Sequence, residues 1–600
     1  MVGGALIAMA LTACSSGFAD ALREETAQST SLALDESRGW LWLASQDDRR
    51  LILLDAWTLE TLRAMDLPGV PAHIALVHET VHVTMEDVGE LWSIDAISGT
   101  LRHQARLPCR GAESVLSLGR EADSALALTC PQDLLLLVVD PREGTVTQRI
   151  ALPSRPGLLA RRGNALAVAA HQGGDVRVHA LLDDAPQARL SEAPDRLSLA
   201  GRPGRSVTNA AILLASPATE AWTLLYDAID NDGDRSRPPE RGGYGDVVDG
   251  DPRIEARASG ACAGAWSRFD GGARVFSGVG AATFSPQGDL LWIAHVGTRN
   301  LGVFHCDRGG EGALLPLAVQ VPLGGGARGI VVSSDGRHAW LDLSFDQAVT
   351  RVTLDERFTA SSVTRRLAVP SHRYTPRAQL GRRLFFDATN THLTPSGVVS
   401  CATCHPGGGD DGVSWFLHTP QVSRRFVRTP PAWALREELG PFHRNGEFEQ
   451  AERLITHTIR QLMGGDALVI DADAIAQWLR ELAPPPARPP YDHEDAQQMI
   501  AGEAVFQRAG CGGCHAGPWM TDGRRHDVVL PSRDPDARIE GGVVTPTLRG
   551  VGARGPWLHD GRALTLESLF AEHNPGDLHG VTSGLNAEEL ESLVHWLGSR

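Results

Sequence analysis

The chain has 600 residues, with 56 basic against 73 acidic side chains and a formal net charge of −17 at pH 7. This acidic balance argues against nucleic-acid binding, which needs a basic surface. The length is sufficient for several domains.

Residues 1–24 are predicted to be a lipoprotein signal and tether. The apolar run from Val2 to Leu11 is too short to span a bilayer as a helix. It leads into Leu-Thr-Ala-Cys, which resembles the lipobox of bacterial lipoproteins and implies a lipidated Cys14. By the same resemblance, the two serines after Cys14 point to the outer membrane of a Gram-negative bacterium. A secretory signal with an incidental cysteine is the alternative.

Residues 25–370 consist of short β-type segments separated by Gly, Asp and Pro. Similar phrases recur from 47, 87, 131 and 345, each with an apolar run that ends near an aspartate, then a turn, then a strand. Asp55, Asp95 and Asp140 are 40 (95 − 55) and 45 (140 − 95) residues apart, which matches one β-propeller blade. The segment therefore resembles a YVTN/WD-like, all-β propeller, for which we predict seven blades, although eight would also fit the period.

Four cysteines of this segment remain for disulfides in an oxidising compartment. Sequence order favours Cys109 with Cys130 and Cys262 with Cys306, while other connectivities stay open. The motif Asp-Asn-Asp-Gly-Asp at 230–234 has hard oxygen ligands for calcium, but its polar surroundings favour a loop at the propeller rim.

Two helical units follow, at 371–483 and 491–600, joined by the Pro-rich linker 484–490. Apolar residues at three- and four-residue spacing predict helices over 471–486 and 586–600. The order of helix, Cys-x-x-Cys-His motif, loop and terminal helix occurs twice. This order is typical of two tandem, all-α cytochrome c units.

The Cys-x-x-Cys-His motifs lie at 401–405 and 511–515. Chance would give about 0.005 such motifs in a chain of this composition, so two are significant. The thiols add to the vinyl groups of haem and the histidine binds its iron. We therefore predict two covalently bound haem c groups and, since haem c is attached outside the cytoplasm, a lipid-anchored periplasmic protein. A zinc site and a redox disulfide are the alternatives. The predicted haem residues are Cys401, Cys404, His405, Cys511, Cys514 and His515.

The last 230 residues resemble the di-haem bacterial cytochrome c peroxidase and MauG family. The matching phrases include GRRLFFD, RTPPAW, FHRNGEF and TPTLRGVGARGPWLHDGRALTLESL. The match covers about 40% of the chain (230 of 600 residues). It implies a peroxide-reactive haem in the first unit and an electron-transfer haem in the second.

The resemblance also implies distal ligands. His573 stands where peroxidases have Met and MauG has Tyr, which predicts a second haem with two histidine ligands. For the first haem, His418 lies near the position of a removable distal histidine, with His443 and Met463 as alternatives.

Three further residues correspond to functional positions of the family. Glu452 matches the distal acid, and Trp433 matches a tryptophan that lies between the two haems and relays electrons. Family members usually have Asn before Thr-Pro, where it contributes to a calcium site between the haems. Arg428 stands there instead, which puts calcium in doubt.

These features predict a di-haem oxidoreductase that reacts with hydrogen peroxide at the first haem and exchanges electrons through the second. Its partner would be a small cytochrome or cupredoxin donor, as in peroxidases, or, as in MauG, a protein substrate with an oxidisable side chain. The propeller would offer such a protein a docking face. A non-catalytic electron-transfer protein that serves the propeller or a partner enzyme is the alternative. In a third hypothesis, the propeller is the functional domain and the haems drain its electrons.

Overall fold

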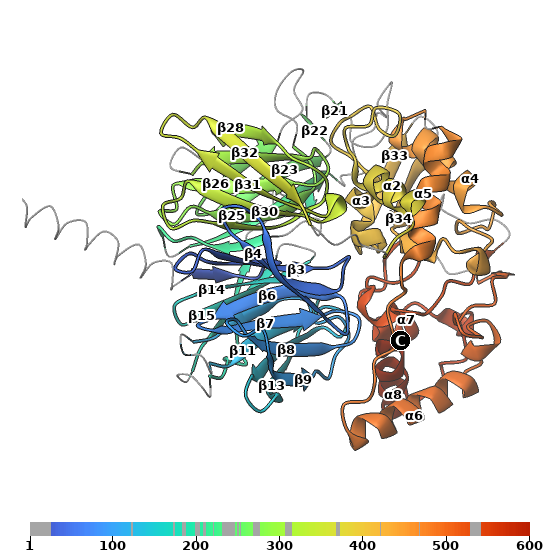
Figure 1. Ribbon diagram of the computed structural model, residues 1–600. Coiled ribbons are helices and arrows are strands. Elements are labelled where there is room, and N and C mark those ends of the chain that lie inside the picture. The colour runs from blue at the N-terminus through green and yellow to red at the C-terminus, as the bar shows by residue number, and fades with distance from the viewer. Residues whose placement is uncertain are drawn as a thin grey trace, which may run out of the picture.

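The computed structural model places the propeller beside two helical units (Figure 1). Cys14 and most of the candidate calcium motif at 230–234 lie outside the described residues. Among the described helices, none combines the length and apolar character needed to cross a membrane. The structure describes residues 26–119, 121, 124–171, 175–182, 188–198, 205–207, 212–219, 221–230, 247–248, 251–252, 254–267, 276–306, 315–367, 373–419, 422–466, 468–528 and 542–600.

Seven antiparallel sheets form the seven predicted blades among the described residues. The first three blades comprise β2 (Leu32–Asp35), β3 (Trp40–Ser45), β4 (Arg50–Asp55) and β5 (Thr61–Asp66); β6 (Pro71–Val77), β7 (Thr80–Met85), β8 (Glu90–Asp95) and β9 (Leu101–Arg106); and β10 (Val115–Ser117), β11 (Leu126–Cys130), β12 (Leu135–Asp140) and β13 (Thr145–Ala151).

The fourth and fifth blades have five strands each. They comprise β1 (Thr26–Gln28), β14 (Pro156–Arg162), β15 (Ala165–Ala170), β16 (Asp175–Ala180) and β17 (Asp195–Ser198); and β18 (Arg205–Val207), β19 (Ile212–Ala215), β20 (Trp222–Asp230), β23 (Ile254–Gly260) and β24 (Gly264–Ser267). The last two blades comprise β25 (Val279–Phe284), β26 (Leu290–His295), β27 (Asn300–His305) and β28 (Leu317–Pro322); and β29 (Ala327–Val332), β30 (His338–Leu343), β31 (Ala348–Leu354) and β32 (Ala360–Arg366).

The recurring aspartate closes the turn after the third strand of a blade. Asp55 Oδ1 accepts the N–H groups of Trp57 and Thr58, and Asp95 Oδ1 accepts those of the two equivalent residues. Such an Asx turn fixes the next strand's direction, because the side chain substitutes for a backbone acceptor. The repeat seen in the sequence is therefore a turn repeat.

Ring closure joins the first and seventh blades through side chains. Ser31 Oγ donates to Asp342 Oδ2 at 2.9 Å, and the buried Trp340 donates its Nε1–H to the carbonyl oxygen of Ala56 at 2.5 Å. Strand β1 instead pairs with β14, so the N-terminal strand lies on the inner strand of the fourth blade.

Both disulfides have the connectivity favoured by sequence order. Cys109 joins Cys130 with an S–S distance of 2.08 Å, at the third blade. Cys262 joins Cys306 and thereby links the fifth blade to the sixth.

The propeller axis opens toward the first helical unit. A cavity of about 280 Å³ lies among the inner strands and is lined by Glu113, His171 and Arg328. A second cavity of about 380 Å³ shares Arg328 with it and reaches Gly407 and Trp478. The axis of the propeller therefore meets the loop that follows the first Cys-x-x-Cys-His motif.

The two helical units repeat one packing motif. Helix α2 (Pro376–Phe386) packs on α5 (Val469–Glu481), and α6 (His493–Arg508) packs on α8 (Ala587–Gly598). Helices α5 and α8 correspond to those predicted over 471–486 and 586–600, but α5 ends five residues earlier than predicted, at Glu481. The Pro-rich linker ends α5, because a proline run cannot continue a helix.

A glycine lets each helix pair approach closely. A Cβ added to Gly381 would lie 1.8 Å from the Ala474 oxygen, and one added to Gly502 would lie 2.0 Å from the Ser592 oxygen. Four residues after each glycine, a phenylalanine ring packs at an inclined angle against a tryptophan of the terminal helix. The ring centres are 4.7 Å apart for Phe385 with Trp478 and 4.5 Å apart for Phe506 with Trp596.

The first unit is not purely helical. Strands β33 (Ser414–Thr419) and β34 (Val422–Arg428) form a hairpin that the sequence analysis did not predict. Ser414 Oγ donates to the Asp560 oxygen, and the Arg428 N–H donates to the His559 oxygen. The hairpin therefore contributes to the junction between the two units.

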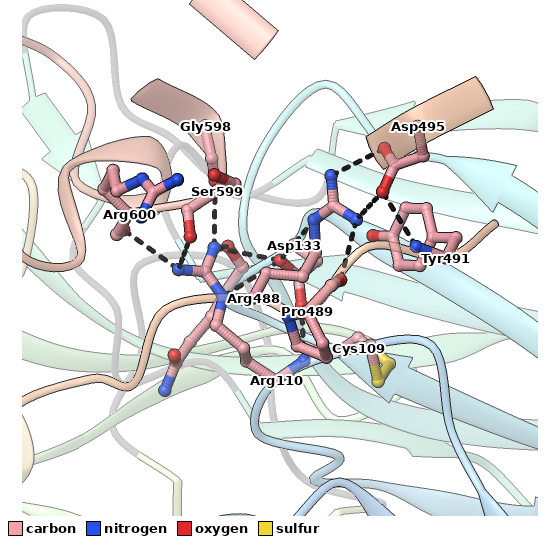
Figure 2. A network of polar contacts seen from close by, with 12 residues as sticks. Cys109, Arg110, Asp133, Arg488, Pro489, Tyr491, Asp495, Gly598, Ser599 and Arg600 are labelled. Carbon is pink, nitrogen blue, oxygen red and sulfur yellow. Dashed lines mark hydrogen bonds and ion pairs between the residues drawn. A yellow bond between two sulfur atoms is a disulfide. The ribbon is translucent and has the colours of Figure 1, made fainter. Parts of the chain in front are cut away.

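Arg110 ties the propeller to the end of the chain (Figure 2). Its guanidinium donates to Asp133, to the carbonyl oxygen of Pro486 and to the backbone oxygens of residues 598–600. The side chains of Arg110 and Asp133 are 2% and 1% exposed. Next to this cluster, Arg488 forms a two-pronged ion pair with Asp495.

Candidate haem centres

The two Cys-x-x-Cys-His motifs lie on short helices that follow α2 and α6. The first is on α3 (Cys401–Cys404), and the second begins on the 3₁₀ turn η6 (Cys511–Gly513). All four thiols are free. Burial raises the pKa of Cys401 to about 12 and also raises that of Cys511, so both are uncharged thiols. The four thiols are thus available for thioether bonds to haem.

The histidine of each motif is held by hydrogen bonds to backbone carbonyl groups, those of Gly409 and Pro430 for His405 and those of Met520 and Pro546 for His515. His405 Nδ1 lies 3.1 Å from the Gly409 oxygen, and His515 Nδ1 lies 3.3 Å from the Met520 oxygen. A carbonyl only accepts, so Nδ1 carries the proton and Nε2 is left as the metal ligand. Burial lowers the pKa of both imidazoles, to about 4 for His515, so that each is neutral as metal binding requires.

A second histidine faces His515. The ring centres of His515 and His579 are 6.3 Å apart, with planes inclined by 50°. Two metal–nitrogen bonds of about 2.0 Å, with about 1.2 Å from each nitrogen to its ring centre, span about 6.4 Å. Burial lowers the pKa of His579, which keeps its imidazole neutral. The separation of the rings is therefore one at which both imidazoles would bind a single iron.

His579 was not among the predicted ligands. The alignment with the family pointed to His573, which lies just beyond helix α7 (Leu566–Ala571) and is half-buried. His579 comes six residues later, after the 3₁₀ turn η9 (Pro575–Asp577). The structure thus favours His579 over His573 as the residue opposite His515.

The distal candidates of the first unit lie in three different elements. His418 is in β33, and its side chain lies outside the described residues. His443 is partly exposed and its Nδ1 bonds to Glu447. Met463 is buried at the end of the π-helix η5 (Ile459–Met463) and packs in the core of the unit.

Glu452 and Trp433 occupy distinct surroundings. Glu452 lies in the first turn of α4 (Ala451–Thr458) and forms an ion pair with Arg480. Trp433 is buried in the 3₁₀ turn η3 (Ala432–Ala434), and the guanidinium carbon of Arg554 lies 5.9 Å from its ring centre. Because Arg554 belongs to the second unit, Trp433 contacts the junction between the units.

The structure adds one acid that the sequence analysis missed. Asp411 is 1% exposed and accepts the indole N–H of Trp415 at 2.8 Å. Burial raises the pKa of the Cys404 thiol, and the nearby Asp411 carboxylate raises it further. Burial raises the pKa of Asp411 to about 7. In the sequence, Asp411 is the second of two aspartates that follow three glycines, and this pattern does not indicate a buried acid.

The junction does not fit calcium at the position of Arg428. Arg428 donates to Asp410 Oδ1 at 3.2 Å, to the Thr429 oxygen at 2.8 Å and to the Arg554 oxygen. A calcium ion would need such carboxylate and carbonyl oxygens as ligands, but here they already accept hydrogen bonds from a guanidinium.

No family model matches the chain. It is 28% identical to the cytochrome c551 peroxidase of Nitrosomonas europaea over 269 residues, which cover 37% of this chain and 78% of that relative. It is 25% identical to the methylamine utilization protein MauG of Methylorubrum extorquens over 327 residues, covering 44% and 87%. The hydrazine synthase subunit gamma of Kuenenia stuttgartiensis is 46% identical over 281 residues, covering 37% and 77%. The chain therefore belongs to the di-haem cytochrome c peroxidase and MauG family, whose domain is joined here to a seven-bladed β-propeller.

Proposed function

We propose that the protein is a periplasmic, lipid-anchored di-haem oxidoreductase that uses hydrogen peroxide at the first haem and exchanges electrons through the second. The observation that carries the proposal is the pair of histidine rings at the second centre. The rings of His515 and His579 are 6.3 Å apart, a separation at which both would bind one iron. This favours electron exchange at the second centre, and we infer that peroxide reacts at the first, as the resemblance to the family implies.

Haem iron with an open axial position can bind peroxide, whereas iron with both positions filled exchanges electrons. Within the protein, His405, His515 and His579 would hold the two groups and fix their orientation. Peroxide reduction consumes two electrons and two protons and yields two waters. Two centres in one chain can store both electrons before the substrate arrives.

We infer that acidic side chains of the first unit supply protons to the first centre. Burial raises the pKa of Asp411 to about 7, so this group can both hold and release a proton near neutral pH. Glu452 keeps its proposed role as the distal acid, with Arg480 as its fixed partner. Trp433, between the units, is the proposed relay for electrons.

The partner is proposed to be either a small cytochrome or cupredoxin donor, or a protein substrate that docks on the propeller. The propeller face that meets the helical units is already covered by them (Figure 1). A partner that uses the propeller would therefore bind its opposite face or its rim.

Peroxide titration of the full-length holoprotein tests this function. In the fully oxidised and one-electron-reduced states, we expect stoichiometric peroxide to change the optical and electron paramagnetic resonance spectra of one haem, with the other haem remaining low-spin. Two low-spin haems that do not respond in either state would contradict peroxide reactivity and leave the alternative of a pure electron-transfer protein.

Removal of one thiol pair tests the haem count. We expect the double variant Cys401→Ser, Cys404→Ser to contain one covalently bound haem where the wild-type chain contains two, because thioether bonds need both thiols. Pyridine haemochrome absorbance and intact mass measure the count. The matched variant Cys511→Ser, Cys514→Ser should also retain one. Retention of two covalent haems in either variant would contradict the assignment.

A further inference from the structure

The junction between the two helical units is built around a buried guanidinium. Arg428 ends β34 of the first unit, and its side chain is 11% exposed. It donates to the Asp410 carboxylate and to the carbonyl oxygen of Thr429 in its own unit. In the second unit it donates to the carbonyl oxygen of Arg554. One side chain therefore bridges both units through three oxygen atoms.

A second arginine, Arg444, also connects the two units. Arg444 donates to the carbonyl oxygen of Arg428 and to that of His559 in the second unit. The backbone N–H of Arg428 also donates to the His559 oxygen at 2.9 Å. Arg428 thus contacts the second unit through both its side chain and its backbone.

The three oxygen atoms that accept hydrogen bonds from Arg428 are of the types that bind hard divalent cations. Calcium binds carboxylate and backbone carbonyl oxygens, and it neutralises the charge of a buried carboxylate. A guanidinium also neutralises a carboxylate, and it does so through directed N–H donors. Unlike a bound cation, it cannot dissociate from the protein. Asp410 is 5% exposed, so a nearby positive charge is needed in either case.

We propose that the Arg428 guanidinium takes the place of a bound divalent cation between the two haem units. Arg428 is thus a positioning residue, which holds the two units in contact. By holding the Arg554 backbone, it fixes the guanidinium of Arg554 over Trp433, the residue proposed to relay electrons. Contact between the units is then independent of calcium. The two haems serve as spectroscopic reporters of this contact, whether or not the first haem reacts with peroxide.

The first test treats the wild-type holoprotein with the chelator EGTA and then with millimolar calcium chloride. We expect neither to shift the thermal transitions or the distribution of one added electron between the haems, as measured by electron paramagnetic resonance. A shift caused by EGTA and reversed by calcium would overturn the proposal. This measurement needs no variant.

The second test compares Arg428→Asn with Arg508→Asn, whose parent side chain is 56% exposed in the second unit. Arg428→Asn should lower the thermal transition and slow electron equilibration between the haems, and calcium or millimolar guanidinium should partly restore both. Arg508→Asn should resemble the wild type. Arg428→Lys keeps the charge and provides a folded variant with an intermediate loss if Arg428→Asn fails to fold. Wild-type behaviour of both Arg428 variants would overturn the proposal.

Discussion

Replacement of His579 by alanine is expected to convert the second haem from a low-spin species with two histidine ligands to a high-spin or water-bound species. The His515 and His579 rings are 6.3 Å apart, and both imidazoles are neutral because burial lowers their pKa values. Without the His579 imidazole, His515 would lose the ring that faces it. Electron paramagnetic resonance and near-infrared magnetic circular dichroism of the oxidised holoprotein would record the change.

His573→Ala is the matched control, because His573 is only six residues away and was the ligand predicted from the family alignment. Its spectra should equal those of the wild type. His579→Met should keep the haem low-spin but give a methionine–iron charge-transfer band and a higher reduction potential, since thioether ligation raises the potential. The opposite pattern, with loss of the low-spin signal in His573→Ala alone, would reinstate the prediction from the alignment.

Much of the fold could be predicted because its signals are local. The blades were visible because each Asx turn needs an aspartate at a fixed place, as at Asp55 and Asp95. The two helical units could be recognised because the segments before and after the first Cys-x-x-Cys-His motif resemble those before and after the second. The cysteine pairs could be proposed because few cysteines remain once the haem thiols are assigned.

The site was less predictable where it depends on the path of a loop. The segment between α7 and α8 contains two histidines, and an alignment cannot decide which one the chain folds back against His515. Asp411 gains its raised pKa from burial, which the sequence does not report. The role of Arg428 depends on oxygens from a segment more than a hundred residues away.

The contacts between propeller and helical units left no sequence signal at all. Arg110 lies in a loop before the third blade, and its acceptors include the last three residues of the chain. Arginines are frequent in this chain, and nothing in its local pattern distinguishes Arg110 from exposed ones. Long-range polar contacts of this kind are defined only once the units pack together.

The largest expected loss of stability follows Arg110→Ala. The substitution leaves the Asp133 carboxylate, which is 1% exposed, without its closest cation, and Arg488 at 3.8 Å is the remaining one. It also leaves the backbone oxygens of residues 598–600 without this donor. Breaking a buried ion pair by removing one partner costs about 3–5 kcal/mol, and each orphaned acceptor adds to that cost.

Because the chain has several domains, the loss should appear as a separate transition and not as one global shift. Differential scanning calorimetry should show an earlier transition in Arg110→Ala, and limited proteolysis should cut faster in the linker 484–490. Arg508→Ala removes only an exposed ion pair with Glu589, worth at most about 1 kcal/mol, and serves as the control. If the two variants melted alike, Arg110 would contribute no more than a surface arginine, and the attachment of the second unit would depend on its other contacts with the propeller.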